Sequence, residues 1–480
     1  MHKFGHEKIK SMTKIKFGTD GWRAIIAKEF TVDNVARVSK AVVLWLRKVK
    51  KEQKGVVIGY DCRFGGKLFA ETVAKVLGKE GIKVYLSDRI VTTPMVSLGT
   101  LELGAALGVV ITASHNPPDY NGYKLKGEFG GPLLSDNVDE VEALIPDEHG
   151  YDLEAISLAD LTKQGLFKEV DLEEMYIKKV EANFDLDLIK KCGLNFAYDA
   201  MYGAGQFVMR RLLPDITFLH CDYNPGFDGT APEPIHRNLL EFSEMIKLAG
   251  DIDCGLATDG DADRLGFYNS KGEFVDSHHI ILLLITYLRK YKKMDGKVVI
   301  AFSVSDRIKK LCKHLGLEVT TTKIGFKYVC DHLINEDVLL GGEESGGVAI
   351  KGHIPERDGV WMGLTIWEYM AKTGKTLDDL VQEVYEIVGA FAFERIDLHL
   401  TEALKQKVME NCKNGSYSEF AGRKITRQES IDGYKFFFGD DEWLMIRPSG
   451  TEPVLRTYCE SSSSKEAFSL LEKSHKLLLN

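Results

Sequence analysis

The stretch "GVVIGYDCRFGGKLFAETVAKVL" (55–77) decides the expected architecture, because an apolar β-branched run passes through a polar, glycine-containing turn into an amphipathic segment. Short strands that alternate with longer helices are typical of α/β proteins with mostly parallel sheets. The same order recurs in "NFAYDAMYGAGQFVMRRLL" (195–213) and in "KVVIAFSVSDRIKKLCKHL" (297–315). We therefore predict an internal repeat of three related α/β units.

Each repeat is expected to continue with a second short strand and then a third strand that ends in an unusual polar loop. These three loops lie in "VVITASHNPPDYNG" (109–122), "CGLATDGDADRLG" (254–266) and "VLLGGEESGG" (338–347). Ligands of open α/β sheets bind beyond the carboxyl ends of the strands. We therefore expect the three loops to contribute complementary groups to one shared site.

The pattern of expected strands and helices changes after about residue 390, where strand-like runs precede a final helix from about Lys465. This pattern predicts a smaller α+β domain with its own polar loop, "RPSGTEP" (447–453). The predicted fold is thus α/β, with three tandem α/β domains of related topology plus a C-terminal α+β domain around a central cleft. The expected divisions are a loose extension over 1–13 and domains over 14–168, 169–273, 274–389 and 390–480.

Composition limits the partners that we expect. The 480 residues are 44% hydrophobic and 28% charged with a net charge of −9, which does not favour a nucleic-acid partner, since phosphate backbones require a basic face. The longest apolar run, "HIILLLITYL" (279–288), is too short to span a membrane, and the polar start does not resemble a signal peptide. Eight scattered cysteines without a CxxC pair indicate free thiols in a reducing compartment, so we expect a cytoplasmic protein with neither nucleic-acid nor membrane partners.

The loop "DGDADR" is interpreted as a divalent-metal site. It places carboxylates at Asp259, Asp261 and Asp263, and Mg²⁺ prefers oxygen ligands that include phosphate. An EF-hand is not favoured, because its sixth and twelfth positions would be Arg264 and Ser270 rather than glycine and an acid. An acidic turn that caps a helix is the simpler alternative.

Ser114 is the candidate nucleophile. A positioned serine beside an oxygen-ligand metal favours phosphoryl transfer, whereas a serine hydrolase of the α/β type would show G-x-S-x-G in place of "TASHN". His115 is poorly placed to act as a base for its own neighbour in sequence. The alternative is a turn serine that bonds its own backbone before Pro117.

Two further loops suggest recognition of a phosphorylated sugar. The carboxylates and hydroxyl of "GGEESGG" (341–347) suit a polyol, although a solvated turn has the same composition. In "RPSGTEP", the fork of Arg447, the hydroxyls of Ser449 and Thr451 and the backbone N–H of Gly450 suit a phosphate dianion. A β-turn that contains an arginine is the alternative.

The four loops together resemble a known family. The set "TASHNPPDYNGYK", "DGDADR", "GGEESGG" and "RPSGTEP", in this order, is similar to the α-D-phosphohexomutases, the superfamily of phosphoglucomutase, phosphomannomutase and phosphoglucosamine mutase. The resemblance extends from "FGTDGWR" (17–23) to the end of the chain. It implies a phosphotransferase of the isomerase class that acts on hexose phosphates.

The resemblance also implies a role for each matching residue. Ser114 would carry the transferable phosphoryl group and would bind Mg²⁺ together with the three aspartates. Lys124 would be the general acid/base, for which its pKa must fall from about 10.4. The other residues implied are His115 and Arg23 beside the phosphoserine, Arg264 and Lys323 in the cleft, Glu343 and Ser345 on the sugar hydroxyls, and Arg447, Ser449, Gly450 and Thr451 on the distal phosphate.

The implied reaction converts a hexose 1-phosphate into the 6-phosphate through a 1,6-bisphosphate, with glucose 1,6-bisphosphate as intermediate or activator. Gly347 stands where some branches carry a histidine, which favours phosphoglucomutase over phosphoglucosamine mutase or a dual mannose activity; His353 is a hypothetical substitute for that imidazole. The alternatives are phosphomannomutase, a glucose-1,6-bisphosphate synthase with a separate donor such as fructose 1,6-bisphosphate, and a non-catalytic sugar-phosphate-binding protein. A monomer or a homodimer is expected.

Overall fold

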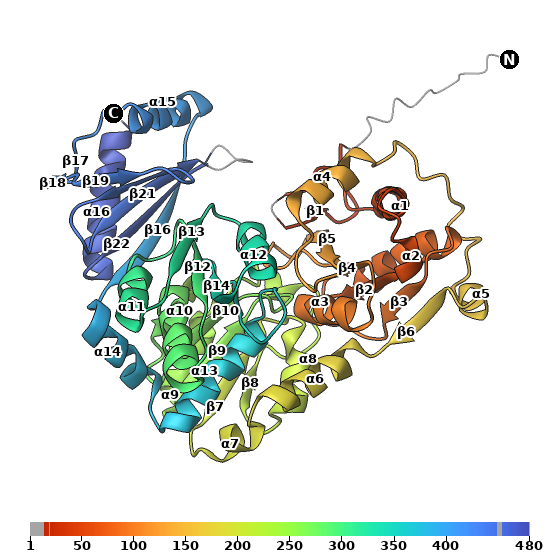
Figure 1. Ribbon diagram of the computed structural model, residues 1–480, viewed down its shortest axis with the longest axis horizontal. Coiled ribbons are helices and arrows are strands. Elements are labelled where there is room, and N and C mark those ends of the chain that lie inside the picture. The colour runs from red at the N-terminus through yellow and green to blue at the C-terminus, as the bar shows by residue number, and fades with distance from the viewer. Residues whose placement is uncertain (1–13, 19, 449–453, 480) are drawn as a thin grey trace.

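The computed structural model describes residues 14–18, 20–448 and 454–479. The predicted extension over 1–13 and residues 449–453 of the predicted phosphate loop, among them Ser449, Gly450 and Thr451, lie outside the described residues. Four large sheets follow one another along the chain, and we call the parts that carry them units I to IV. Figure 1 shows unit I and unit IV on opposite sides of the molecule, with units II and III between them.

Unit I contains a six-stranded sheet in the order β1-β5-β4-β2-β3-β6. Strands β4, β2, β3 and β6 are parallel to one another, while at the opposite edge β5 pairs antiparallel with β4 and β1 pairs antiparallel with β5. The strands are β1 (Trp22–Ile25), β2 (Val56–Tyr60), β3 (Val84–Ser87), β4 (Leu107–Ile111), β5 (Tyr120–Gly127) and β6 (Phe167–Val170).

Units II and III repeat part of this arrangement. Their sheet orders are β11-β10-β9-β7-β8 and β13-β12-β14-β15. The strands of unit II are β7 (Phe196–Asp199), β8 (Thr217–Leu219), β9 (Cys254–Thr258), β10 (Leu265–Asn269) and β11 (Phe274–Val275); those of unit III are β12 (Lys297–Ala301), β13 (Val319–Thr322), β14 (Val338–Gly342) and β15 (Val348–Ile350).

The predicted internal repeat is confirmed by strand order. In each unit the first strand of the repeat lies between the second and the third, and the fourth is antiparallel beside the third: β3-β2-β4-β5, β8-β7-β9-β10 and β13-β12-β14-β15. The equivalent third strands are therefore β4, β9 and β14. All three are buried along their whole length, as expected for the centre of a sheet covered on both faces.

Unit IV is an α+β domain, as predicted. Its main sheet, in the order β16-β22-β21-β20-β19, is antiparallel throughout, and β17 and β18 form a separate small pair. The strands are β16 (Ala392–His399), β17 (Glu419–Phe420), β18 (Arg423–Lys424), β19 (Arg427–Glu429), β20 (Tyr434–Phe437), β21 (Trp443–Pro448) and β22 (Val454–Ser461).

Most helices begin at a residue whose side chain accepts a backbone N–H, such as Thr31, Thr92 and Asp358, and α14 has a full capping box between Thr376 and Asp379. The helices are α1 (Val32–Lys48), α2 (Gly66–Lys79), α3 (Thr93–Glu102), α4 (Ser135–Ala143), α5 (Leu158–Lys163), α6 (Leu172–Asn183), α7 (Leu186–Lys191), α8 (Gly205–Leu212), α9 (Leu240–Ala249), α10 (Ser277–Thr286), α11 (Arg307–Leu315), α12 (Phe326–Asn335), α13 (Gly359–Thr373), α14 (Leu377–Val388), α15 (Glu402–Lys413) and α16 (Ser464–Leu478). Among the residues described, no helix combines the length and apolar composition that crossing a bilayer requires.

The apolar core is divided unequally. One continuous cluster of buried side chains runs from Val57 in unit I through Leu256 in unit II to Trp367 in unit III. Unit IV closes a core of its own around residues such as Phe436 and Leu455. Units I to III therefore form one packed body, and unit IV joins it through a smaller contact.

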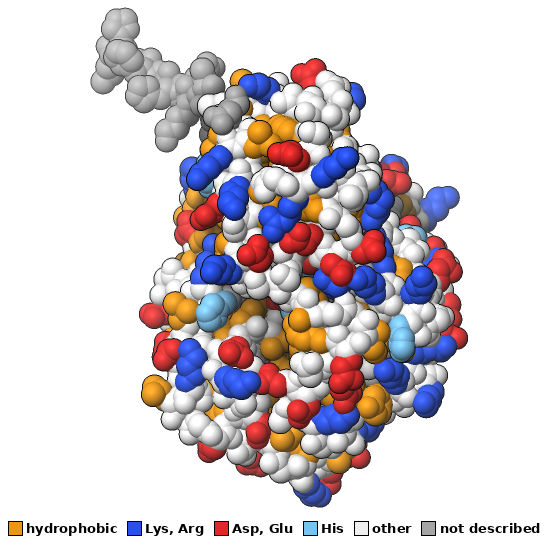
Figure 2. Space-filling model, turned by 90° about the vertical axis from the view of Figure 1, so that its left-hand side faces the viewer, with side chains coloured by type: hydrophobic (Ala, Val, Ile, Leu, Met, Phe, Trp, Pro, Cys, Tyr) orange, Lys and Arg blue, Asp and Glu red, His pale blue; other side chains and the backbone are white. Residues whose placement is uncertain are grey.

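On the face shown in Figure 2, basic and acidic side chains are interspersed.

The contact between units III and IV contains a buried lysine. Lys435 of β20 is 1% exposed, donates to the carbonyl oxygen of Val304 (3.2 Å) and lies 3.8 Å from the ring centre of Trp443. Its carboxylate neighbour, Asp306, is 3.6 Å away. Burial lowers the pKa of Lys435 from 10.5 to about 8, because Asp306 offsets only part of the lost hydration.

We expect this ammonium to make stability depend on pH in a defined window. Between about pH 8 and 10.5 the unfolded chain keeps a proton on Lys435 that the folded chain has lost, so stability rises with pH. The free energy of unfolding of the wild type minus that of Lys435→Met should rise by up to about 3 kcal/mol across this window and stay level below it. Urea unfolding followed by tryptophan fluorescence measures the difference. The same comparison with Lys413→Met, at an exposed position of α15, should stay flat; a flat difference for Lys435→Met would contradict the assignment.

Candidate active site

Three equivalent strands deliver three polar loops to one place. Ser114 follows β4, Asp259 follows β9 and Glu343 follows β14. Direct contacts join the three units here: the N–H of Leu265 donates to the carbonyl of Gly346 (3.3 Å), and the N–H of Thr93, the first residue of α3 in unit I, donates to the carbonyl of Asp261 (3.0 Å). The carboxyl ends of the third strands in units I, II and III thus converge.

Ser114 faces the aspartate loop of unit II. Its side chain is buried, and its hydroxyl donates to Asp259 Oδ2 at 2.7 Å. The backbone of Ser114 is left-handed, with φ of 54°. Gly260 allows the two loops to approach this closely, because a Cβ at that position would lie 2.5 Å from the carbonyl oxygen of Ser114. The serine and the first aspartate, 145 residues apart, are therefore in direct contact.

The three aspartates form a compact, fully buried group. Asp259, Asp261 and Asp263 each offer a carboxylate oxygen within 4.8 Å of the others. One oxygen each of Asp261 and Asp263, Oδ1, is buried without a hydrogen-bond partner among the described residues. Burial, followed by the two neighbouring carboxylates, raises the pKa of Asp259 well above its usual value. Unpaired carboxylate oxygens in a buried acidic group fit the needs of a hard cation such as Mg²⁺.

Lys124 lies among these acids and remains charged. Its Nζ contacts Asp261 Oδ2 (2.8 Å), Asp263 Oδ2 (3.0 Å) and Asp20 Oδ2 (2.9 Å), and the side chain is fully buried. Burial alone would lower the pKa of this lysine, but Asp20, Asp261 and Asp263 outweigh burial and raise it. The lowered pKa that a general acid/base role requires is therefore absent from this arrangement, since the acids nearby stabilise the ammonium.

Arg357 and Asp20 belong to the site although the sequence did not single them out. Nη2 of Arg357, in unit III, is 2.5 Å from Asp20 Oδ2 in unit I and 2.7 Å from Asp263 Oδ2 in unit II. One guanidinium thus joins three units. The available signals were short polar segments: Asp20 lies in "FGTDGWR", and Arg357 precedes Asp358, the residue that caps α13.

His115, Arg23 and Arg264 surround the serine. His115 Nδ1 is 3.3 Å from the Ser114 hydroxyl, and burial, followed by Arg264 and Arg23, holds the pKa of this imidazole well below its usual value. Arg23 donates to Asn116 Oδ1 in the serine loop (2.8 Å). Arg264 donates its backbone N–H to Asp259 Oδ1 (3.0 Å). Every predicted residue of this part of the site is therefore brought to one place.

The loop after β14 lies at the other side of the site. Glu343 is buried and accepts the N–H of Gly325 at the start of α12 (2.8 Å), and burial, with Glu344 as a smaller cause, raises its pKa to about 7. Ser345 is half-buried in the following turn, and Lys323 is exposed just before α12. Glu344 accepts a hydrogen bond from Ser303.

Unit IV presents a row of arginines. Arg447 on β21 pairs with Asp432 (Nε–Oδ1 3.2 Å), whose other oxygen accepts the N–H of Ile324 in unit III (3.0 Å). Arg447 lies directly opposite Arg456 on β22, and Arg395 lies on β16 opposite Tyr458. Since alternate residues of a strand share a face, all three arginines lie on one face of the sheet. Sequence reasoning missed Arg395 and Arg456, which sit outside the "RPSGTEP" loop.

His353 and Gly347, which the sequence suggested as determinants of substrate specificity, have structural roles instead. The side chain of His353 is buried, stacks on Trp361 (ring centres 3.7 Å apart) and has its Nε2 2.9 Å from Asp358 Oδ2, so it does not replace an imidazole in the site. Gly347 instead makes room for Arg357, because a Cβ at position 347 would lie 2.4 Å from Arg357 Cδ.

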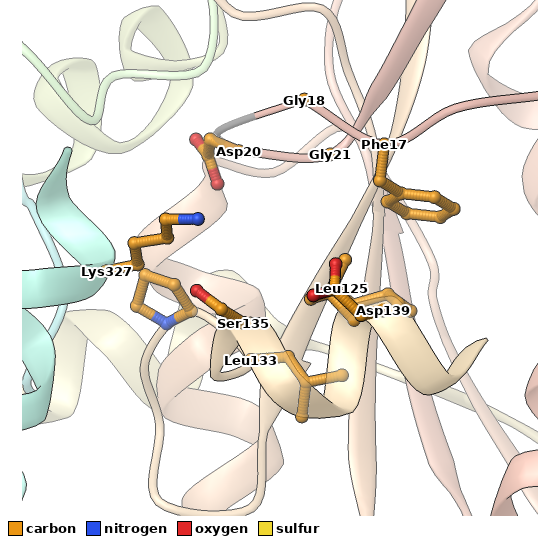
Figure 3. A pocket seen from close by; sticks show the side chains of 11 residues that line it. Phe17, Gly18, Asp20, Gly21, Leu125, Leu133, Ser135, Asp139 and Lys327 are labelled. Atoms are coloured by element: carbon orange, nitrogen blue, oxygen red, sulfur yellow. The ribbon is translucent and has the colours of Figure 1, made fainter. Parts of the chain in front are cut away.

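A small pocket opens beside Asp20. It has a volume of about 180 Å³ and lies between unit I and α12. Figure 3 shows Lys327 of α12 reaching toward Asp20 from one side, with Ser135 and Asp139 of α4 on another. The site therefore borders a solvent-accessible space at the junction of units I and III.

The fold and this site define a class: a protein of three repeated α/β units and a fourth α+β unit, with a buried serine facing a carboxylate triad. The family models described as Phosphoglucomutase/phosphomannomutase match all four units, as alpha/beta/alpha domain I (14–152), domain II (174–272), domain III (276–388) and the C-terminal domain (403–474). The chain belongs to the phosphoglucomutase/phosphomannomutase family and is a phosphohexomutase, an isomerase that transfers a phosphoryl group.

Relatives are similar over nearly the whole chain. A phosphoglucomutase/phosphomannomutase of Thermococcus kodakarensis is 31% identical and a phosphoglucosamine/phosphogalactosamine mutase of Sulfurisphaera tokodaii is 30% identical, each over 96% of this chain and 98% of the relative. A crystal structure of a Thermus thermophilus protein assigned as a phosphomannomutase has 32% identity and a TM-score of 0.86, and the match covers 98% of this chain and 100% of that one.

We predict that Gly347→Ala disturbs the site through Arg357. The added methyl group would overlap the Arg357 side chain and move its guanidinium from Asp20 and Asp263. Overpacking of this kind costs about 1–3 kcal/mol, so the melting temperature should fall. Gly226→Ala, at an exposed glycine with φ of −87°, is the matched control and should change stability little. Equal melting temperatures for Gly347→Ala and wild type would contradict the prediction.

Proposed function

We propose that this phosphohexomutase interconverts hexose 1-phosphate and hexose 6-phosphate, most readily of glucose, through a phosphoserine at residue 114 and a 1,6-bisphosphate intermediate. The observation that carries the proposal is the 2.7 Å contact between the Ser114 hydroxyl and Asp259 in a chain of this family. A hydroxyl that rests on a buried carboxylate triad is suited to exchange of a phosphoryl group rather than to acyl transfer.

The residues of unit I would handle the phosphoryl group. The neutral imidazole of His115 and the guanidinium of Arg23 lie beside the serine. The ammonium of Lys124, held charged by its three carboxylate neighbours, would offset negative charge on the phosphoryl oxygens and donate toward the oxygen that leaves. Arg357 would share this electrostatic task from unit III.

Asp259, Asp261 and Asp263, together with the phosphate on Ser114, would hold Mg²⁺, and the unpaired oxygens of Asp261 and Asp263 support this assignment. A bound magnesium ion would supply positive charge to the phosphoryl oxygens during transfer.

The rest of the site would select and orient the sugar phosphate. Glu343 and Ser345 would accept hydrogen bonds from the sugar hydroxyls and donate hydrogen bonds to them. Lys323 and Arg264 would line the approach to the site. Arg447, with the loop residues Ser449, Gly450 and Thr451, would grip the phosphate distant from Ser114. One fixed phosphate grip and one fixed serine require the bisphosphate to turn between the two half-reactions.

We also propose domain boundaries near residues 168, 273 and 389.

Alternative substrates and reactions rest on specific observations. Relatives about 30% identical include proteins named phosphoglucosamine mutase and phosphoglucomutase/phosphomannomutase. Glucosamine phosphates and mannose phosphates are therefore the alternative candidate substrates. A glucose-1,6-bisphosphate synthase would use the same serine and metal but release the bisphosphate. Magnesium, glucose 1,6-bisphosphate and a monomeric or homodimeric state complete the proposal.

A substrate panel tests the function. Purified protein with Mg²⁺ is given the 1-phosphates of glucose, mannose and glucosamine, with a trace of the matching bisphosphate or with stoichiometric fructose 1,6-bisphosphate. A mutase should form the 6-phosphate with the trace alone, and glucose 1-phosphate should give the highest kcat/KM. Consumption of the donor in step with bisphosphate release would instead identify a synthase, and no product from any sugar would refute both.

Ser114→Ala should abolish both turnover and covalent labelling. Wild-type protein incubated with glucose 1,6-bisphosphate should gain the mass of one phosphoryl group on the peptide that contains residue 114, because the hydroxyl of this serine faces the aspartate triad. Ser157→Ala, at the cap of the remote helix α5, is the control and should retain both properties. Labelling that persists in Ser114→Ala would place the phosphoryl group elsewhere.

Divalent cations should stabilise the protein through the aspartate triad. Binding to the folded state alone adds about 2.7 kcal/mol at 100 times the dissociation constant, so Mg²⁺ or Mn²⁺ should raise the melting temperature. Asp263→Asn should lose most of this increase, whereas Asp160→Asn, at an exposed position of α5, should keep it. An increase that is equal in Asp263→Asn and wild type would show that the cation binds at another place.

A further inference from the structure

The segment Asp61–Arg63 directly follows β2 and touches the serine loop. In sheet I, β2 lies beside β4 in parallel, with Tyr60 paired to Ile111. The chain leaves both strands at the same edge, so Asp61 emerges next to Thr112, and the N–H of Asp61 donates to the carbonyl of Ile111 (3.1 Å). The topology therefore places this segment under the loop that carries Ser114.

Arg63 binds the backbone of the serine loop at four points. Its guanidinium donates to the carbonyl oxygens of Ser114 (2.7 Å), Asn116 (2.6 Å), Pro117 (2.8 Å) and Tyr120 (2.9 Å). The residue is 1% exposed. A guanidinium has five N–H donors, of which four are on the two Nη atoms. Both Nη atoms are thus occupied by loop carbonyls, and Nε faces Asp61 Oδ2 at 3.5 Å. Arg63 therefore acts on the loop and not on a substrate.

Asp61 holds the other backbone group of Ser114 through Thr112. The Ser114 N–H donates to Thr112 Oγ1 (2.8 Å), and the Thr112 hydroxyl donates to Asp61 Oδ2 (2.5 Å). Asp61 Oδ1 accepts the backbone N–H of Arg63 (2.9 Å). The N–H and the C=O of the serine are consequently both fixed by one tripeptide, in a closed ring of hydrogen bonds.

Such a restraint has a clear physical task. Ser114 has φ of 54°, a conformation that residues other than glycine adopt only when their surroundings impose it. In this conformation the hydroxyl reaches Asp259 of unit II, and the carbonyl turns toward Arg63. Release of the carbonyl would let the serine relax to negative φ and move its hydroxyl away from the aspartates.

We propose that Arg63, supported by Asp61, is a positioning residue of this enzyme: it holds Ser114 in the left-handed conformation that presents its hydroxyl for phosphoryl transfer. The inference rests on the proposed function of Ser114 and adds residues outside the loops assigned to the reaction. Fixed geometry matters here because a misplacement of about 1 Å can reduce a rate about 100-fold.

The test compares Arg63→Met and Arg63→Lys with Arg89→Met. Methionine keeps the length without donors, and lysine keeps the charge without the planar fork. Arg89 is the control, since it also follows a strand of sheet I but is 44% exposed and pairs with surface acids. We expect kcat to fall about 100-fold in Arg63→Met with KM within a few-fold of wild type, a smaller fall in Arg63→Lys, and no change in Arg89→Met.

Two further measurements separate positioning from general stability. Guanidinium ion or methylguanidinium at millimolar concentration should restore part of kcat in Arg63→Ala, whose side-chain space is empty, and should not affect Arg89→Met. Hydrogen exchange at residues 113–122 should accelerate in Arg63→Met while exchange in units II to IV is unchanged. If Arg63→Met does not fold, Arg63→Lys carries the same comparisons.

The outcomes distinguish this inference from the proposed function. Wild-type kcat and KM retained in both Arg63 variants would overturn the positioning role while the mutase activity stands. A uniform loss of structure in Arg63→Lys, without a kcat-specific effect or rescue, would also overturn it. Absence of mutase activity in the wild type would refute the proposed function, and with it the catalytic role of Arg63, even if hydrogen exchange showed that Arg63 orders the loop.

Discussion

Compensation of buried charge is the constraint on which the rest of the structure depends. Three carboxylates, of Asp20, Asp261 and Asp263, meet two cations, of Lys124 and Arg357, almost without access to water. Buried charges are tolerated only when each has a partner at short range. When one partner is removed, the desolvation free energy of the remaining charge is no longer compensated. Unit I pairs Asp20 with its own Lys124, but Asp261 and Asp263 of unit II find their cationic partners in units I and III. The network therefore fixes how units I, II and III meet.

Much of this arrangement could be predicted from the sequence because it follows from topology. Equivalent strands in a repeat end at equivalent edges, so the serine after β4 and the aspartates after β9 were expected together. The 2.7 Å contact between Ser114 and Asp259 is the direct result. Three related α/β units were predicted for the same reason, since each unit repeats one pattern of strand, helix and strand. Periodicity and loop composition carry this information locally.

The remainder depends on contacts that no local pattern encodes. Arg357 meets Asp20 across 337 positions of sequence, and "PERDG" alone is indistinguishable from a solvated turn before a helix. A general acid/base role requires the pKa of Lys124 to fall, but Asp20 of its own unit and two acids of unit II raise it. His353 is near the site in sequence, yet its ring stacks on Trp361, because α13 turns back against it. The direction in which a side chain points and the extent of its burial depend on the tertiary structure.

The separate core of unit IV has an evolutionary consequence. Its apolar residues pack mainly on one another, whereas units I to III share one large cluster of buried side chains, beside a second core that belongs to unit I. A change inside the shared interior must be matched in several units at once. Changes in unit IV, by contrast, can accumulate without altering the body that holds the serine and the acids. The unit that carries the arginine row can therefore vary in sequence with the least effect on the packing of the units that hold the serine and the acids.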